Sequence, residues 1–110
     1  MKFCKTAICA IALPVMVAAQ PTFATETLQQ RGQQLAQRLC GECHAIGRSG
    51  ASPLPAAPRF RTLDDGIDFS ELSRRMQEGL LSGHQDMPMF RFSRDDADAI
   101  VAYMRSIQGQ

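Results

Sequence analysis

Three stretches of the chain place apolar residues at helical spacing. They cover residues 25–43, 69–81 and 93–108, and in each the apolar positions fall on one face of a helix with 3.6 residues per turn. No stretch sustains the alternation of apolar and polar residues that predicts a strand. The sequence therefore predicts an all-α fold with three main helices. The repeating positions are Leu28, Leu35, Ala36 and Leu39 in the first stretch, Phe69, Leu72, Met76 and Leu80 in the second, and Ala97, Ile100, Val101, Met104 and Ile107 in the third.

Polar residues suited to capping stand at the start of each predicted helix. Thr25 or Thr27 can cap the first, Asp68 or Ser70 the second, and Ser93 the third. A side-chain oxygen at such a position accepts a hydrogen bond from one of the free N–H groups of the first helical turn. These residues therefore indicate where each helix begins.

Gly32 interrupts the first predicted helix on or beside its apolar face. A glycine inside a helix costs about 1 kcal/mol relative to alanine. The pattern leaves two interpretations open. Gly32 is either a tolerated weak point or a place where another helix crosses at very short range.

The first 24 residues have the layout of a secretory signal peptide. Two lysines form a basic start, residues 6–19 are almost wholly apolar, and small residues lead to a cleavage point after Ala24. The apolar run is shorter than the roughly 20 residues that a membrane-spanning helix needs. An uncleaved N-terminal anchor is the alternative. We expect the signal to be removed and residues 25–110 to form one domain.

The predicted domain is small and nearly neutral. Removing 24 residues from 110 leaves 86, with ten arginines, no lysine and eleven carboxylates, which gives a formal charge of −1. Nucleic-acid binders carry a strong basic excess, so the composition does not favour that class. A chain this short buries only about 60–65% of its unfolded surface, so a cofactor, metal or disulfide often supplements its core.

Two segments between the predicted helices are loops. Residues 45–66 contain three of the four prolines of the predicted domain, and residues 84–92 are broken by the fourth, Pro88. Proline lacks an N–H group and cannot continue a helix or a central strand. A long loop is uncommon in a compact domain unless it covers something. We therefore expect the longer loop to wrap around a bound group.

Cys40, Cys43 and His44 form the sequence Cys-Gly-Glu-Cys-His at the end of the first predicted helix. A zinc site needs about four ligands, but only His84 could join these three, and the adjacent Cys43 and His44 do not easily chelate one ion. A thioredoxin-like dithiol needs strands and the N-terminus of a helix, and neither is predicted here. The remaining interpretation is covalent haem attachment, for which C-x-x-C-H is the signature.

Covalent attachment accounts for this spacing. The two thiols add across the two vinyl groups of a haem and form thioethers, and the adjacent histidine is then held where an imidazole nitrogen can coordinate the iron. An electron carrier needs a second axial ligand as well. The loop of residues 84–90 offers three candidates, which are His84, Met87 and Met89.

The predicted domain resembles the small class I cytochromes c of the bacterial periplasm over nearly all of residues 26–108. The segment "CGECH" matches the attachment site of that family, "MPMF" resembles the loop that supplies its axial methionine, and "IVAYMRS" resembles its last helix. The family usually has a glycine at the position of Gly32, which an aromatic residue of the last helix crosses. The resemblance therefore favours the close-crossing interpretation of Gly32.

The resemblance also implies a set of ligands for one haem c. In this family a backbone carbonyl from a proline segment accepts a hydrogen bond from the proximal histidine, and Pro53 and Pro55 are the candidates here. The implied set is Cys40 and Cys43 for the two thioethers, His44 as the proximal iron ligand and Met87 as the distal iron ligand.

The chain departs from the family at two points. Ala36 stands where the family often has an aromatic residue, four positions after the helix glycine. His44 and Met87 are 43 positions apart, fewer than in mitochondrial cytochrome c. The second departure suggests a smaller lower loop and a more exposed haem edge.

We therefore predict the cytochrome c fold, with three main helices and two loops around one haem c. The expected function is one-electron transfer in the periplasm, without enzymatic activity. The expected partners are redox proteins of a respiratory or dehydrogenase chain, and the mature chain is expected to be monomeric and not to span the membrane. One alternative is a haem-bearing subunit of a periplasmic dehydrogenase or oxidase complex. The other is a haem enzyme or gas sensor with a labile sixth ligand.

The surface around the haem is predicted to be basic as well as apolar, with Met89 or Phe90 near the contact with a partner. Arg59 and Arg61 are also candidates to pair with the haem propionates, because arginine binds carboxylates in a bidentate manner. A mainly apolar docking patch is the alternative. The five arginines in or beside the predicted loops are Arg48, Arg59, Arg61, Arg91 and Arg94.

Overall fold

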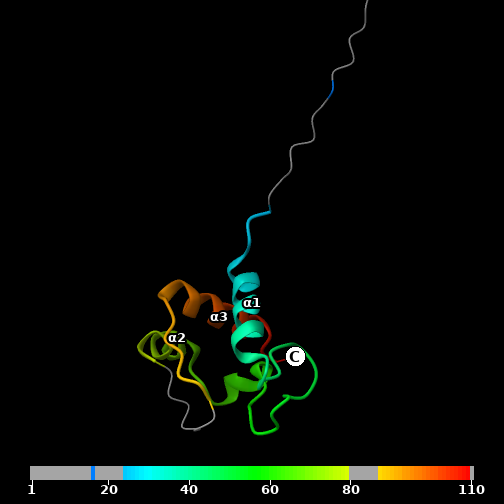
Figure 1. The fold of residues 1–110 in the computed structure, drawn as a ribbon, viewed down its shortest axis with the longest axis vertical. Helices are drawn as coiled ribbons and strands as arrows, with labels where there is room; N and C mark the ends of the chain where they lie inside the picture. The colour runs from blue at the N-terminus through cyan, green and yellow to red at the C-terminus, as the bar shows by residue number, and fades with distance from the viewer. Residues whose placement is uncertain (1–15, 17–23, 80–86, 110) are drawn as a thin grey trace, which may run out of the picture.

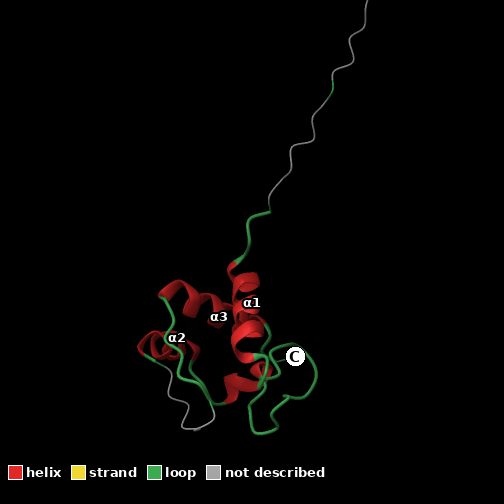
Figure 2. Cartoon of the chain, in the orientation of Figure 1, coloured by secondary structure: helices red, strands yellow, loops and turns green. Residues whose placement is uncertain are grey.

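The computed structural model describes Met16 and residues 24–79 and 87–109. Within these residues it contains three α-helices, one short 3₁₀-helix and no strand (Figures 1 and 2), which confirms the predicted all-α fold. None of the helices described is long and apolar enough to cross a membrane. In chain order the elements are α1 (Leu28–Cys40), η1 (Phe60–Asp65), α2 (Phe69–Glu78) and α3 (Arg94–Ser106).

Each α-helix begins at one of the predicted caps. The Thr27 hydroxyl accepts a hydrogen bond from the Gln30 N–H at 3.2 Å, and the Gln30 side chain accepts one from the Thr27 N–H at 2.8 Å. This reciprocal pair is a capping box. The Asp68 carboxylate caps α2, and the Ser93 hydroxyl caps α3 by accepting from the Asp96 N–H at 3.2 Å.

The helices differ from the sequence prediction in several features. The first helix covers Leu28–Cys40 rather than residues 25–43, and the last ends at Ser106 rather than Gln108. The helix η1 lies inside the segment predicted as loop, because a 3₁₀ turn needs only i→i+3 hydrogen bonds and is too short to show a period. In addition, α2 ends at Glu78 rather than Leu81. The next residue, Gly79, has φ +105°, a conformation that suits glycine and ends the helix. Residues 80 and 81 lie outside the described residues.

The core forms where α1 and α2 pack against α3. Figure 1 shows α1 and α3 close together, with the loops at the C-terminal end of α1. Gly32 is buried at the crossing of these two helices, and a Cβ atom there would lie 1.9 Å from the carbonyl oxygen of Ala99 and 2.9 Å from Cβ of Tyr103. The close-crossing interpretation of Gly32 is therefore confirmed. Ala36, the first departure from the family pattern, is fully buried in the same core.

Polar contacts connect the elements at the edges of this core. Arg31 on α1 forms an ion pair of 2.6 Å with Asp96 on α3. The buried Tyr103 hydroxyl donates to the carbonyl oxygen of Ile46 at 2.7 Å, which ties the loop after His44 to α3. These contacts tie the first turn of α1 and the loop after His44 to α3.

The glycine contact generates the first prediction. A methyl group at Gly32 would force α1 and α3 apart, so Gly32→Ala should lower the free energy of unfolding by about 1–3 kcal/mol, as overpacked cores do. Denaturant unfolding of the haem-loaded protein measures this loss. Gly47→Ala is the matched control, because a Cβ atom there meets nothing within 4 Å. Equal stability of the two variants would contradict the close crossing.

Candidate cofactor site

An apolar cavity of about 370 Å³ brings the predicted ligands together. Cys40, Cys43 and His44 line it, and so does Met87 from the distant loop. The volume falls within the range of about 300–1,000 Å³ that is typical of pockets for small molecules and cofactors. Apolar side chains from every helix complete the wall, among them Leu39, Phe60, Ile67, Leu72, Phe92 and Met104.

The end of α1 places both cysteines and the histidine at the cavity. Cys40 is the last residue of the helix. Its carbonyl oxygen accepts hydrogen bonds from the N–H groups of Cys43 at 3.2 Å and His44 at 2.9 Å. The chain therefore turns tightly at this point, and the three side chains reach the same cavity.

The alternative chemistries of the two cysteines find no support here. Both thiols are free, and burial together with the neighbouring Cys43 raises the pKa of Cys40 to about 11. A dithiol used for disulfide exchange needs a thiolate near neutral pH, and this environment disfavours it. Among the described residues no group of three or more His, Cys, Asp or Glu side chains is placed to hold a metal ion. His84 lies outside the described residues.

The imidazole of His44 is oriented by the backbone of the proline-rich loop. Its Nδ1 lies 2.7 Å from the carbonyl oxygen of Pro58. A carbonyl oxygen only accepts hydrogen bonds, so Nδ1 carries the proton and Nε2 keeps a free lone pair. The ring of Phe60 packs beside the imidazole, with 5.2 Å between the ring centroids. His44 is thus held in the tautomer that a metal ligand needs.

The prediction that Pro53 or Pro55 accepts this hydrogen bond is wrong. The N–H of Leu54, which lies between these two prolines, donates to the carbonyl oxygen of Cys43 at 3.1 Å. This bond fixes the first part of the loop beside the cysteine, and a turn then brings Pro58 under the imidazole. Three prolines within six positions look alike in the sequence, and only the path of the loop distinguishes them.

Of the two methionines described in the second loop, Met87 reaches the cavity. It is half-buried and lines the wall, whereas Met89 is 66% exposed and is not part of the lining. Pro88 lies between them and also lines the cavity. The third candidate, His84, falls outside the described residues.

Arg61 has a structural role that the sequence did not indicate. Its side chain is only 9% exposed, and Nη2 donates to the carbonyl oxygen of Gly50 at 2.7 Å. Its Nη1 atom is buried and has no hydrogen-bond partner among the residues that the structure describes. Arg59 is exposed, and neither arginine lines the cavity. Arg61 therefore anchors the loop and retains an unused donor.

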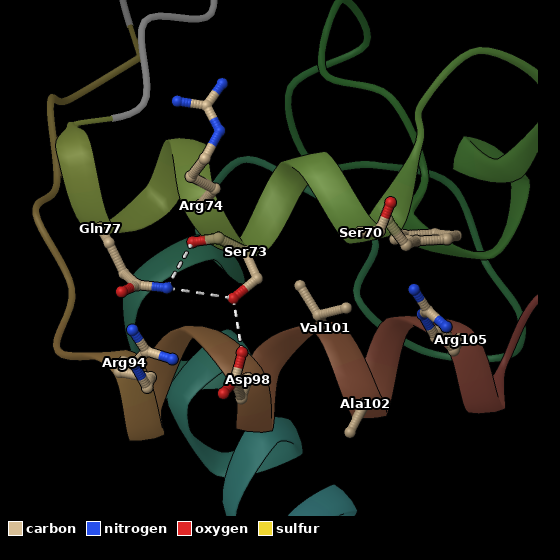
Figure 3. A pocket seen from close by; sticks show the side chains of 10 residues that line it. Ser70, Ser73, Arg74, Gln77, Arg94, Asp98, Val101, Ala102 and Arg105 are labelled. Atoms are coloured by element: carbon tan, nitrogen blue, oxygen red, sulfur yellow. Dashed lines mark hydrogen bonds between the residues drawn. The ribbon is translucent and has the colours of Figure 1, made fainter.

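A second, more open cleft of about 520 Å³ lies between α2 and α3 and contains none of the predicted ligands. Figure 3 shows its polar lining, in which Ser73 donates to Asp98 at 2.5 Å and Gln77 donates to Ser73. Arg74, also in this lining, pairs with Glu71 and with Glu78. Ser73, Arg74 and Gln77 of α2 in this cleft thus already have hydrogen-bond or ion-pair partners within the protein. The apolar cavity is the better candidate for a cofactor.

The cavity generates the second prediction, which concerns folding without a cofactor. A cofactor in this cavity would supply packing partners for its apolar walls, and a chain this short has only a small core of its own. Cys40→Ser/Cys43→Ser protein that contains no haem should therefore show much less helical circular dichroism than the haem-loaded wild type. A cooperative, native-like melt of the haem-free variant would contradict this expectation.

A family model and a relative matched over most of its length point to the same family. The cytochrome c family model matches residues 29–108. The chain is 33% identical over 98 residues to a cytochrome c-552 of Bradyrhizobium diazoefficiens, and the match covers 89% of this chain and 92% of that protein. It is 31% identical over 93 residues to a cytochrome c oxidase subunit 2 of Alkalihalophilus pseudofirmus, covering 76% of this chain but only 27% of that protein. No solved structure matches the chain significantly.

Proposed function

The chain belongs to the cytochrome c family, and we propose that it is a periplasmic electron carrier with His44 and Met87 as the axial ligands of its haem. Membership of this family implies one covalently bound haem c and a role in electron transfer. The observation that carries the finer proposal is the placement of Cys40, Cys43, His44 and Met87 around one apolar cavity. Two thiols suit covalent attachment of a haem, and an imidazole with a thioether is the axial pair of electron-transfer cytochromes c.

Haem c supplies one-electron redox chemistry when bound. The side chains of this chain set its environment. Cys40 and Cys43 would hold it covalently, and the Pro58 carbonyl keeps the Nε2 lone pair of His44 available. The thioether of Met87 and the apolar walls would disfavour additional positive charge on a bound haem and so raise its reduction potential. Pro88 fixes the backbone beside Met87 and so stiffens the ligand loop.

Arg61 is a better candidate than Arg59 to pair with an anionic propionate. A buried guanidinium with only one carbonyl partner is costly, because burial removes the charge from water. A carboxylate beside Nη1 would offset that cost, whereas the exposed Arg59 already has water. Pairing with a propionate would then hold both the loop and the cofactor.

The export proposal rests on the first 24 residues, which have the basic, apolar and small-residue order of a signal peptide. We propose cleavage after Ala24 and a mature domain of residues 25–110. Haem attaches through thioethers only to reduced thiols, so after export to an oxidising compartment the two cysteines must stay unpaired until the haem is attached. Cys40 and Cys43 are free, as this attachment needs. The expected partners are redox proteins of a respiratory or dehydrogenase chain.

A second candidate function is that of a fixed haem subunit. The relative from Alkalihalophilus pseudofirmus is named as an oxidase subunit, and the match covers only 27% of it, so a domain of this kind also occurs as part of a larger protein. In that case the chain would still transfer electrons, but within a permanent complex. Purification from the native source distinguishes the two, because a subunit would elute with its complex and a free carrier would elute as a small monomer.

The third prediction is covalent attachment through Cys40 and Cys43. Protein made with a cytochrome c maturation system should begin at Thr25 and carry the mass of one haem under denaturing conditions. Thioether bonds survive denaturation, so acid-acetone treatment should leave the haem on the chain. Extraction of the haem by acid-acetone would refute the attachment. A mass that retains residues 1–24 would instead support the uncleaved anchor.

The fourth prediction assigns the distal ligand. Met87→Ala should abolish the weak far-red charge-transfer band of oxidised protein and lower the potential, because a soft thioether favours ferrous iron. It should also allow the ferrous protein to bind CO rapidly. Met89→Ala is the matched control and should change neither band nor CO binding, since Met89 does not line the cavity. Loss of the band in Met89→Ala alone would overturn the assignment, and rapid CO binding by the wild type would favour an enzyme or gas sensor.

A further inference from the structure

The side chain of Gln108 bonds to η1 near both of its ends. Gln108 follows the last turn of α3, which lies beside η1 (Figure 1). Its Nε2 atom donates to the carbonyl oxygen of Phe60 at 2.7 Å, and its Oε1 atom accepts from the N–H of Asp64 at 3.0 Å. These partners are 48 and 44 positions away in the sequence. A single amide group therefore joins the C-terminal end of α3 to η1.

The amide of Gln108 has only one orientation that satisfies its partners. Nε2 carries two donors, and it also donates to the carbonyl oxygen of Met104 at 2.7 Å. A carbonyl oxygen only accepts and an N–H only donates, so exchanging the amide nitrogen and oxygen would break all three bonds. The bond to Met104 caps the last turn of α3. The two bonds to η1 are not needed for that cap.

Phe60 connects this amide to the candidate iron ligand. Its N–H donates to the carbonyl oxygen of Ala45 at 3.0 Å, and its ring packs beside the imidazole of His44. Pro58, two residues earlier, provides the carbonyl oxygen that lies 2.7 Å from Nδ1 of His44. This short segment is thus bonded to the start of the proline-rich loop on one side and to the end of α3 on the other.

Gln108 lies behind the wall of the cofactor cavity rather than in it. Phe60 and Met104, whose carbonyl groups accept from its amide, both line the cavity, and Gln108 does not. Gln108 is half-buried, and the preceding Ile107 is only 1% exposed. The buried neighbour fixes where the side chain of Gln108 begins. The amide therefore acts on the cavity through the backbone groups that it holds.

We propose that Gln108 is a positioning residue for His44. Without its amide, η1 and the segment before it would lose two bonds to the end of α3, and the Pro58 carbonyl would hold the Nδ1 proton less firmly. An acceptor at this proton makes an imidazole a more basic ligand and fixes the orientation of its ring. Gln108 thus sustains the donor strength of the proximal ligand from a distance. This inference rests on the proposed role of His44 as an axial ligand.

Exchange of the Nδ1 proton of His44 with deuterium measures how firmly this proton is held. It is followed by NMR of the ferrous, haem-loaded protein with isotope-labelled histidine. Gln108→Leu removes all three bonds at similar side-chain size, so local opening around Pro58 should become easier. We expect exchange at least about tenfold faster than in the wild type. The reduction potential should rise as well, because a less basic imidazole stabilises ferric iron less.

Ser106→Ala is the matched control. The Ser106 hydroxyl donates to the carbonyl oxygen of Tyr103 at 2.6 Å, so its loss weakens the same end of α3 without removing a bond to η1. Exchange and potential should both remain at the wild-type values. Equal exchange rates in Gln108→Leu and the wild type would overturn the proposal, and so would an equal acceleration by Ser106→Ala.

Gln108→Glu is a second variant with the shape of the native side chain. It keeps the acceptor for the Asp64 N–H, but an ionised carboxylate cannot donate to the Phe60 carbonyl. Exchange at neutral pH should again be faster than in the wild type. A wild-type rate in Gln108→Glu would contradict the proposal even if Gln108→Leu did not fold. A wild-type protein that lacks a haem-shifted His44 signal would overturn the axial role of His44 and this inference with it, whereas failure of the inference alone leaves that signal intact.

Discussion

The close approach of α1 and α3 at Gly32 is the constraint on which the rest of the molecule depends. The absence of a side chain allows the two helix backbones to touch, and this contact fixes the position and direction of α1. Cys40 is the last residue of α1, so its place relative to α3 follows from the same contact. The turn that carries Cys43 and His44 begins from the Cys40 carbonyl. Gly32 lies eight residues before Cys40, about two helical turns, which is near enough to set the geometry of the site.

The proline-rich loop completes the site through its backbone carbonyl groups, which bond with the side chains of His44, Arg61 and Tyr103. The Pro58 carbonyl selects the tautomer of His44, and the Arg61 guanidinium holds the loop through the Gly50 carbonyl. Tyr103 ties the start of the loop to α3. The loop can therefore be long and irregular and still orient an iron ligand, because each of its ends is bonded to a rigid element.

Local signals in the sequence predicted most of the helical structure, because caps and apolar periods depend on neighbouring residues alone. Thr27, Asp68 and Ser93 begin the helices as their side chains suggest. The features that escaped prediction depend on the path of the chain in three dimensions. The choice of Pro58 follows from a turn in the loop, and the same path brings the Gly50 carbonyl to the buried Arg61 guanidinium. For the site, the motif indicated Cys40, Cys43 and His44, and the family resemblance indicated Met87.

The central claim is that one cofactor is held between His44 and Met87. Proton and carbon NMR of the ferrous protein with labelled methionine methyl groups tests it directly, because the ring current of a haem shifts a methyl group above its plane far upfield. Residues 25–110 contain four methionines, which are Met76, Met87, Met89 and Met104. The account predicts that one methyl signal is shifted far upfield and that it disappears in Met87→Ala. The absence of any such signal, or its assignment to Met89, would contradict the account.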